Sequence, residues 1–184
     1  MSAALHQLRN RIRRLEQGHA PADGLSESLP SGVSPGVPLG VPAIDQALPW
    51  RGLPRGMVHE ILCRDAADGV PTAFLLALVG LQQRAQRAAG GDGTVLWVSC
   101  RQDLFAPALP VYGCDPAAFL FVRCASGADV LWAMEDGLRC PALAAVAGDV
   151  GALDFPLTRR LQLAANRGNV PLFLHRAQKG SALT

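Results

Sequence analysis

Short apolar segments alternate with longer amphipathic segments over most of this chain. The short segments are nearly continuous in apolar residues, which is typical of strands that are covered on both faces. We expect five such strands, over residues 57–62, 94–100, 119–124, 143–149 and 170–175. Apolar positions at helical spacing predict helices between them, over about 73–89, 104–112, 128–138 and 156–167. This alternation predicts an α/β fold with a doubly wound, mainly parallel sheet and helices on both faces.

The first part of the chain has a different pattern. In residues 1–17, apolar residues recur three and four positions apart, which predicts a short amphipathic helix with a basic opposite face. The apolar stripe is a candidate protein interface and consists of Leu5, Leu8, Ile12 and Leu15. A helix of about four turns is marginal alone, so the stripe must pack on the chain's own core, on another subunit or on a partner. The arginines offer an alternative role in nucleic-acid binding, but no aromatic residue is interleaved for base stacking, so we expect DNA binding to be weak or absent.

Residues 18–40 are rich in Pro, Gly and Ser, which interrupts every periodicity and predicts a linker. The linker separates the N-terminal helix from a core over residues 41–184. A chain of 184 residues is long enough for one domain with a substantial core and short for two. The linker would let the N-terminal helix reach away from its own core.

The composition narrows the class of protein further. Apolar residues make up 49% of the chain, charged residues make up 17%, and the net charge is +2, all of which fit a soluble globular protein. No apolar run approaches the roughly 20 residues that cross a bilayer, so we expect no membrane association. The five cysteines lack the spacing of zinc ligands and are an odd number. They are best interpreted as buried thiols of a cytoplasmic protein, with Cys100 as the single candidate for a reactive thiol.

The segment between the first strand and the first long helix lies where many α/β proteins bind a ligand. A Walker A loop there reads G-x-x-x-x-G-K-[ST], because its Lys reaches the phosphates and its hydroxyl holds Mg²⁺. Aligning the motif on Gly69 puts Val70 at the lysine position and Pro71 at the hydroxyl position. Aligning it on Thr72 puts Pro71 at the lysine position and Asp65 at the first glycine. Neither alignment gives a working phosphate site.

The same segment also carries groups that oppose phosphate. Pro71 removes a backbone N–H at the entrance to the helix, where an anion would need donors. Asp65 and Asp68 place negative charge where that anion would lie. We therefore interpret the segment as a degenerate phosphate loop, formed by Cys63, Arg64, Asp65, Asp68, Gly69, Val70, Pro71 and Thr72.

The ends of the other expected strands are poor in catalytic groups. Arg101 follows the second strand, where an NTPase usually has a carboxylate, and an arginine cannot act as a base. Asp149 ends the fourth strand and is expected to form a turn or a helix cap rather than to bind a metal. His59 lies within the first strand and is expected to be a satisfied core histidine. These residues predict a protein that is not an enzyme and that holds no metal and no cofactor.

Several segments resemble the core of the RecA ATPases. "LGVPAIDQALPWRGLPRGMVHEIL" resembles the run that leads into the phosphate loop of that core, and "ADVLWAMEDGLRCPALAAVAGD" resembles its helix and Walker B strand. The resemblance covers about Leu39 to Arg176. It implies a RecA-like fold in which the Walker lysine position falls on Val70, the water-polarising glutamate on Arg101, and the Walker B aspartate on Gly148 or Asp149.

Among RecA-like proteins, the chain most resembles the ImuA family. The matching segments are "LRNRIRRLEQG", "GVPAIDQALPWRGLPRGMVHEI" and "LDFPLTRRLQLAANRGNVPLFLHR". This resemblance implies a non-catalytic protein of SOS-induced translesion DNA synthesis and mutagenesis, which links ImuB and RecA with an error-prone polymerase. It also implies that members continue beyond the last strand found here, so we expect a chain that lacks its C-terminal region.

Two other functions are compatible with the same fold. A SulA-type cell-division inhibitor, which acts on the division GTPase FtsZ, also lacks the phosphate loop. A true NTPase or recombinase would show stabilisation by nucleotide. The N-terminal stripe additionally predicts self-association, by docking of one chain's N-terminal segment on a neighbour.

Overall fold

The computed structural model describes residues 35–63, 69–101, 104–151 and 153–177. Its centre is one sheet of five strands: β1 (Val58–Cys63), β2 (Val95–Ser99), β3 (Phe119–Arg123), β4 (Ala145–Asp149) and β5 (Leu172–Ala177). The strand order is β1-β5-β4-β2-β3, and every neighbouring pair is parallel. The predicted parallel sheet is therefore confirmed, and all five strands lie within about two residues of the predicted ranges.

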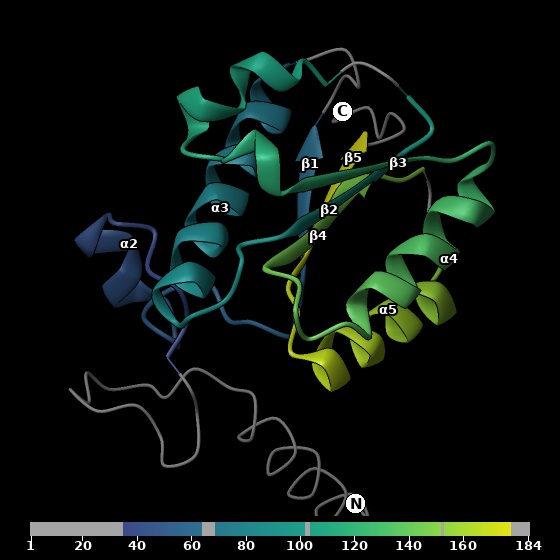
Figure 1. Ribbon diagram of the computed structural model, residues 1–184. Coiled ribbons are helices and arrows are strands. Elements are labelled where there is room, and N and C mark those ends of the chain that lie inside the picture. Colours follow the sequence, from purple (N-terminus) through teal and green to yellow (C-terminus); the bar gives the residue numbers. More distant parts are fainter. Residues whose placement is uncertain (1–34, 64–68, 102–103, 152, 178–184) are drawn as a thin grey trace, which may run out of the picture.

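Helices cover both faces of this sheet (Figure 1). The helices of the described residues are α2 (Pro42–Ala47), which has no buried residue, α3 (Gly69–Ala88), α4 (Gly127–Leu138) and α5 (Phe155–Gly168), with short 3₁₀ helices η1 (Ala106–Tyr112) and η2 (Pro116–Ala118). The helices α3 and η1 pack on one face, while α4 and α5 pack together on the other. This arrangement confirms the predicted doubly wound α/β fold. No helix in the described ranges is long and apolar enough to cross a membrane.

Each face of the sheet has its own apolar core. The core under α3 includes Leu75 and Val79 of that helix with Trp97 and Phe173 from the strands. The core under α4 and α5 includes Met134, Leu138 and Leu161 with Val146, Leu172 and Leu174. Successive residues of a strand point to opposite faces, so β4 and β5 contribute to both cores, and residues 145–148 and 172–175 of these strands are buried. Coverage of both faces, as predicted, therefore explains the nearly continuous apolar sequence of these strands.

The sequence also determines where the two helices of the second face begin. The side chain of Ser126 accepts a hydrogen bond from the backbone N–H of Asp129 at the start of α4. Asp154 does the same for Leu157 at the start of α5. Such caps satisfy backbone donors that the first turn leaves without partners.

Two helical segments differ from the prediction. α2 was not predicted, because six residues show too little periodicity, and α3 begins at Gly69, four residues earlier than expected. Pro71 is compatible with this earlier start, since the first turn of a helix does not use its backbone N–H groups. Residues 1–34, with the predicted N-terminal helix and its Leu5, Leu8, Ile12 and Leu15 stripe, lie outside the described residues, as does most of the predicted linker.

Candidate functional site

The degenerate loop joins the end of β1 to the start of α3, as predicted. Cys63 is the last residue of β1, and Gly69, Val70, Pro71 and Thr72 form the first turn of α3. Arg64, Asp65 and Asp68 lie outside the described residues. The side chain of Val70, at the Walker lysine position, is 72% exposed. An exposed isopropyl group at this position offers no charge to a phosphate.

Cys63 is paired with His175 at the carboxyl ends of β1 and β5. Its sulfur lies 3.1 Å from Nε2 of His175, and it also donates to the backbone oxygen of Arg176 at 3.4 Å. A thiol beside an imidazole is the arrangement of many cysteine nucleophiles. Here both side chains are buried, which keeps them away from a substrate. We interpret the pair as a structural contact between the edge strand and its neighbour.

Arg101 and Asp149 form an ion pair at the same end of the sheet. The Nε atom of Arg101 lies 3.2 Å from Oδ2 of Asp149, and the backbone N–H of Arg101 donates to the hydroxyl of Ser99 at 2.8 Å. The expectation that Asp149 forms a turn or a helix cap is therefore wrong. Sequence reasoning missed this pair because Asp149 ends β4 and Arg101 follows β2, and these strands are adjacent only in the folded sheet.

The register also decides which residue could act at the Walker B aspartate position. A Cβ atom at Gly148 would lie 1.9 Å from the backbone oxygen of Val98 and 2.7 Å from Cε of Met134 on α4. A side chain at residue 148 would therefore enter the core under α4. Asp149 lies two residues beyond Ala147, which packs in the core under α3. Because alternate residues of a strand share a face, the carboxylate of Asp149 points to the α3 face. Of the two aligned residues, only Asp149 directs its side chain to the α3 face of the sheet, and its carboxylate already pairs with Arg101.

His59 has the satisfied surroundings expected of a structural histidine. Its ring stacks on Phe173 with the centroids 5.0 Å apart, and Nε2 lies 3.0 Å from the backbone oxygen of Pro54. Burial lowers the pKa of His59, while the hydrogen bond to Pro54 opposes that shift. The side chain is half-buried rather than fully in the core. Within the described ranges, no group of three or more His, Cys, Asp or Glu residues could hold a metal ion.

The five cysteines occupy two kinds of environment. Cys63, Cys114 and Cys124 are buried, as predicted, whereas Cys100 and Cys140 are exposed. The expectation of buried thiols is therefore wrong for these last two. Burial raises the pKa of Cys114 to about 11, although the positive charge of Arg84 acts in the opposite direction.

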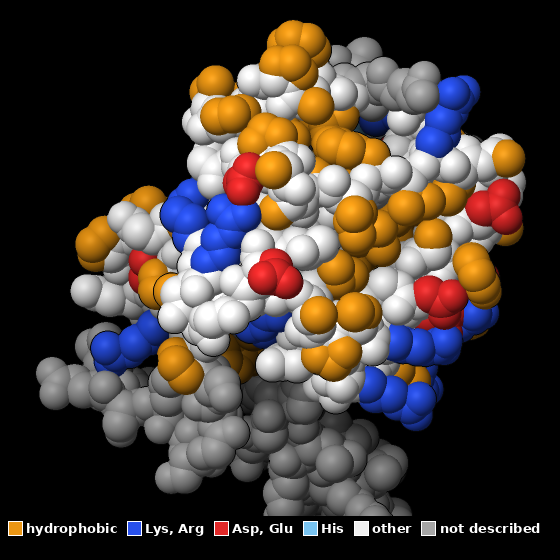
Figure 2. Space-filling view, viewed as in Figure 1, with side chains coloured by type: hydrophobic (Ala, Val, Ile, Leu, Met, Phe, Trp, Pro, Cys, Tyr) orange, Lys and Arg blue, Asp and Glu red, His pale blue; other side chains and the backbone are white. Residues whose placement is uncertain are grey.

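The edge strand β3 exposes an apolar surface that the sequence reasoning did not find. Leu120, Phe121 and Val122 are 54%, 49% and 37% exposed, and we call these three residues the β3 surface. β3 pairs only with β2, so its other edge has no strand partner among the described residues. Figure 2 shows the hydrophobic side chains that gather over this part of the molecule. The apolar run predicts a strand covered on both faces, because a single run does not reveal the strand's place in a sheet.

A second apolar surface lies at the opposite edge of the sheet. A groove of about 600 Å³ between β1 and α5 is lined by Val58, Phe155 and Leu163, with Glu60 and Arg159 among its polar groups. Phe155 and Leu163 are both exposed. The two edge strands of the sheet therefore each adjoin exposed apolar side chains.

Comparison with known proteins adds the family to this description. No family model matches the sequence. The curated proteins named ImuA from two strains of Caulobacter vibrioides are each 37% identical to this chain over 152 residues, which are 80% of this chain and 60% of the relatives. The chain thus spans about three fifths of the length of the curated relatives that it matches. In fold it is similar to the crystal structure of SulA from Pseudomonas aeruginosa, with a TM-score of 0.53, 17% identity, and coverage of 65% of this chain and 97% of that one. The likeness to SulA concerns the fold alone, whereas the identity to the Caulobacter proteins is extensive, and this chain belongs to the ImuA family.

Proposed function

We propose that this protein is a non-catalytic RecA-like component of the ImuA–ImuB mutagenesis system. In this role it links ImuB and RecA with an error-prone polymerase during SOS-induced translesion synthesis. The family to which the chain belongs supports the place in this system. The observation that supports a non-catalytic role is the junction of β1 and α3, where Val70 stands in place of the phosphate-binding lysine.

The groups around that junction support the same proposal. Catalysis of phosphoryl transfer relies on positively charged groups and Mg²⁺ around the phosphates and on a residue that positions the attacking water. Arg101 stands at the position of the water-polarising carboxylate and pairs with Asp149, the last residue of β4. The pairing satisfies the charge of Asp149 within the protein. A nucleotide would have to displace Arg101 before Asp149 could hold a metal ion.

A protein of this kind acts through its surfaces, and the β3 surface is our candidate for partner binding. The unpaired edge of a strand presents backbone N–H and C=O groups that can pair with an extended segment of another protein. At β3 this edge coincides with exposed Leu120, Phe121 and Val122. Apolar side chains beside open backbone groups provide both affinity and specificity for an added strand. The N-terminal stripe of Leu5, Leu8, Ile12 and Leu15 is a second candidate, for a partner or for self-association.

Co-purification with ImuB and with RecA tests the proposal. We expect wild-type protein to retain ImuB, and the double variant Leu120→Lys/Val122→Lys to lose it, because two charges at the edge oppose strand addition. The matched control is Leu163→Lys on α5, where an equally exposed leucine lies on the other side of the molecule. All variants should keep their far-ultraviolet circular dichroism. Retention of ImuB by the double variant would remove β3 from the proposal, and failure of wild type to bind either protein would contradict the proposed role.

Further measurements separate the alternatives. A true nucleotide ligand at 100 times its Kd should stabilise the fold by about 2.7 kcal/mol. We expect no shift in the melting temperature with ATP and Mg²⁺, and no ATP hydrolysis. Binding to FtsZ in the absence of binding to ImuB would instead favour the SulA-type function. We also expect binding to DNA to be weak and to decrease steeply with salt.

A further inference from the structure

Cys100 and Cys124 directly follow the last paired residues of β2 and β3. Ser99 pairs with Arg123 in the register of these parallel strands, and the backbone N–H of Cys124 donates to the oxygen of Ser99 at 3.0 Å. Continuing this register by one residue places Cys100 opposite Cys124. Neighbouring strands lie about 4.8 Å apart, and disulfides join residues whose Cα atoms are about 4.4–6.8 Å apart. We propose that Cys100 and Cys124 form an oxidation-sensitive pair that closes to an intramolecular disulfide when the protein meets a peroxide.

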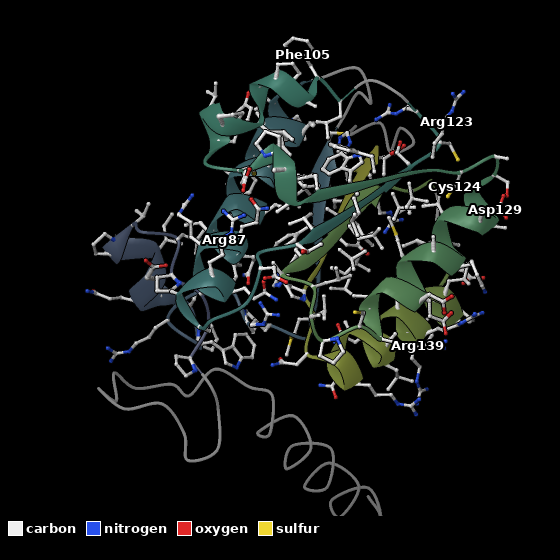
Figure 3. All side chains as sticks on the ribbon, viewed as in Figure 1. Arg87, Phe105, Arg123, Cys124, Asp129 and Arg139 are labelled. Carbon is white, nitrogen blue, oxygen red and sulfur yellow. The ribbon has the colours of Figure 1, made fainter. Side chains whose placement is uncertain are left out.

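The local structure holds both residues near each other. After β2, the backbone N–H of Arg101 donates to Oγ of Ser99, which turns the chain at Cys100. After β3, the capping residue Ser126 begins α4 two positions beyond Cys124. Figure 3 shows Cys124 beside Arg123 at the end of β3, close to Asp129 in the first turn of α4. Each thiol thus lies on a short connection that is held by hydrogen bonds.

The two thiols differ in exposure, and this difference assigns their roles. Cys100 is exposed and can meet an oxidant, whereas Cys124 is buried beside Val130 and Met134 in the core under α4. Burial raises the pKa of Cys124, and the neighbouring groups Cys100 and Asp129 raise it further. An electrostatic effect of one thiol on the other requires that they lie near each other. Cys100 is therefore the residue that reacts with the oxidant, and Cys124 is the residue that resolves the product.

The chemistry needs only the peroxide in addition to the two side chains. The Cys100 thiolate attacks one oxygen of the peroxide, the O–O bond breaks, and a sulfenic acid forms while the other oxygen leaves as water or alcohol. The sulfur of Cys124 then attacks the sulfur of Cys100, and its proton leaves with the hydroxyl group as water. Two thiols have lost two electrons and two protons, and the peroxide has gained them. Thiol reductants reverse the reaction.

The other cysteines cannot substitute for either member of this pair. Cys63 lies on β1 at the opposite edge of the sheet, with β5, β4 and β2 between it and β3. Cys114 lies in the core under α3, on the other face from Cys124. Cys140 is exposed, but it follows α4 at the end away from Cys124. Cys140 is therefore the matched control, since it is also exposed and has no cysteine opposite it on a neighbouring strand.

Mass spectrometry after treatment with hydrogen peroxide tests the proposal on the full chain. We expect the monomer to lose the mass of two hydrogens and a proteolytic digest to contain one peptide pair joined through Cys100 and Cys124. The native protein should change from two thiols that react with an aromatic disulfide reagent to one, because Cys140 remains. In Cys140→Ser the number of reactive thiols should fall from one to none. In Cys100→Ser no cross-link can form, so the same peroxide treatment should leave one reactive thiol, that of Cys140.

Several outcomes would overturn the pair. These are a sulfinic acid on Cys100 with Cys124 still reduced, a link through any other cysteine, or a disulfide between two chains as the main product. Cys124 is buried, so Cys124→Ser could unfold the protein; Cys124→Ala keeps a small apolar group in the core and serves as the second variant. In folded Cys124→Ala, which circular dichroism identifies, peroxide should leave Cys100 as a sulfenic acid that dimedone traps. Absence of such trapping, together with a wild-type cross-link, would contradict the assigned roles.

Discussion

Arg101 and Asp149 meet across the carboxyl ends of β2 and β4, with 3.2 Å between Nε and Oδ2. Their side chains are 37% and 23% exposed, so water screens much of the attraction between them. Ion pairs in such positions contribute about 0–1 kcal/mol to stability. The pair is therefore better explained by its effect at the end of the sheet, where an arginine neutralises the carboxylate of the last residue of β4.

A double-mutant cycle on this pair measures that contribution. We expect Arg101→Ala and Asp149→Ala to have a coupling energy below about 1 kcal/mol in urea unfolding, because both side chains are partly solvated. The coupling should decrease further at high salt. A coupling of several kcal/mol would show that the pair supports the fold, contrary to our interpretation.

Gly148→Ala should destabilise the protein more than any surface substitution. The new Cβ atom would lie 1.9 Å from the backbone oxygen of Val98, so β2 and β4 would have to move apart. Overpacking of this kind costs about 1–3 kcal/mol, which urea unfolding can measure. Gly127→Ala is the control, because a Cβ atom there meets nothing within 4 Å and Gly127 lies in the first turn of α4. That variant should be as stable as wild type or slightly more stable.

The stability of the protein should depend on pH through His59. Burial lowers the pKa of His59 in the folded state below its value of about 6.5 in the unfolded chain. As the pH falls from about 6.5 towards the folded pKa, the unfolded state binds the proton first, so the free energy of unfolding decreases. His59→Phe keeps an aromatic ring against Phe173 but cannot bind a proton. In urea unfolding, the free energy of unfolding should therefore decrease less between pH 7.5 and pH 5 for this variant than for wild type. Equal decreases would exclude His59 as the cause.

Reaction of the thiols should follow their burial. The pKa of Cys114 is raised to about 11, and its sulfur donates to the backbone oxygen of Leu76 at 3.2 Å. Since the thiolate is the reactive form, Cys114 should remain unlabelled by iodoacetamide at pH 8 in the native protein. Exposed Cys140 should react within the same time, and denaturation with urea should make both react alike. Labelling of native Cys114 would show that α3 and η1 open readily.

The strands were predictable because their apolar runs are bounded by Gly, Pro and polar residues. β4 and β5 are buried on both faces, so the run of apolar residues directly reflects their position. β3 has an equally apolar sequence and lies exposed at an edge. A strand's place in the sheet depends on pairings across long distances in sequence, and a single run carries no information on them.

The candidate site was predictable to a similar extent. The sequence placed Val70 and Arg101 in the segments that follow strand ends, where the resemblance to the RecA ATPases implies a lysine and a glutamate. The contacts of the site residues could not be predicted from the sequence. Cys63 and His175 are 112 residues apart in sequence and meet only because β1 pairs with β5. Asp149 likewise meets Arg101 only because β4 lies beside β2.

Residues 35–37 and the end of β5 lie at opposite ends of the strands of the sheet. Val37 pairs with Leu53 just before β1 begins, so residues 35–37 lie near the amino ends of the strands. β5 ends at Ala177, at the carboxyl ends of the strands (Figure 1). A six-residue strand is about 20 Å long, which sets the separation between these two ends of the described chain. Labels attached near Gly36 and near Ala177 would therefore lie at opposite ends of the strands, about one strand length apart.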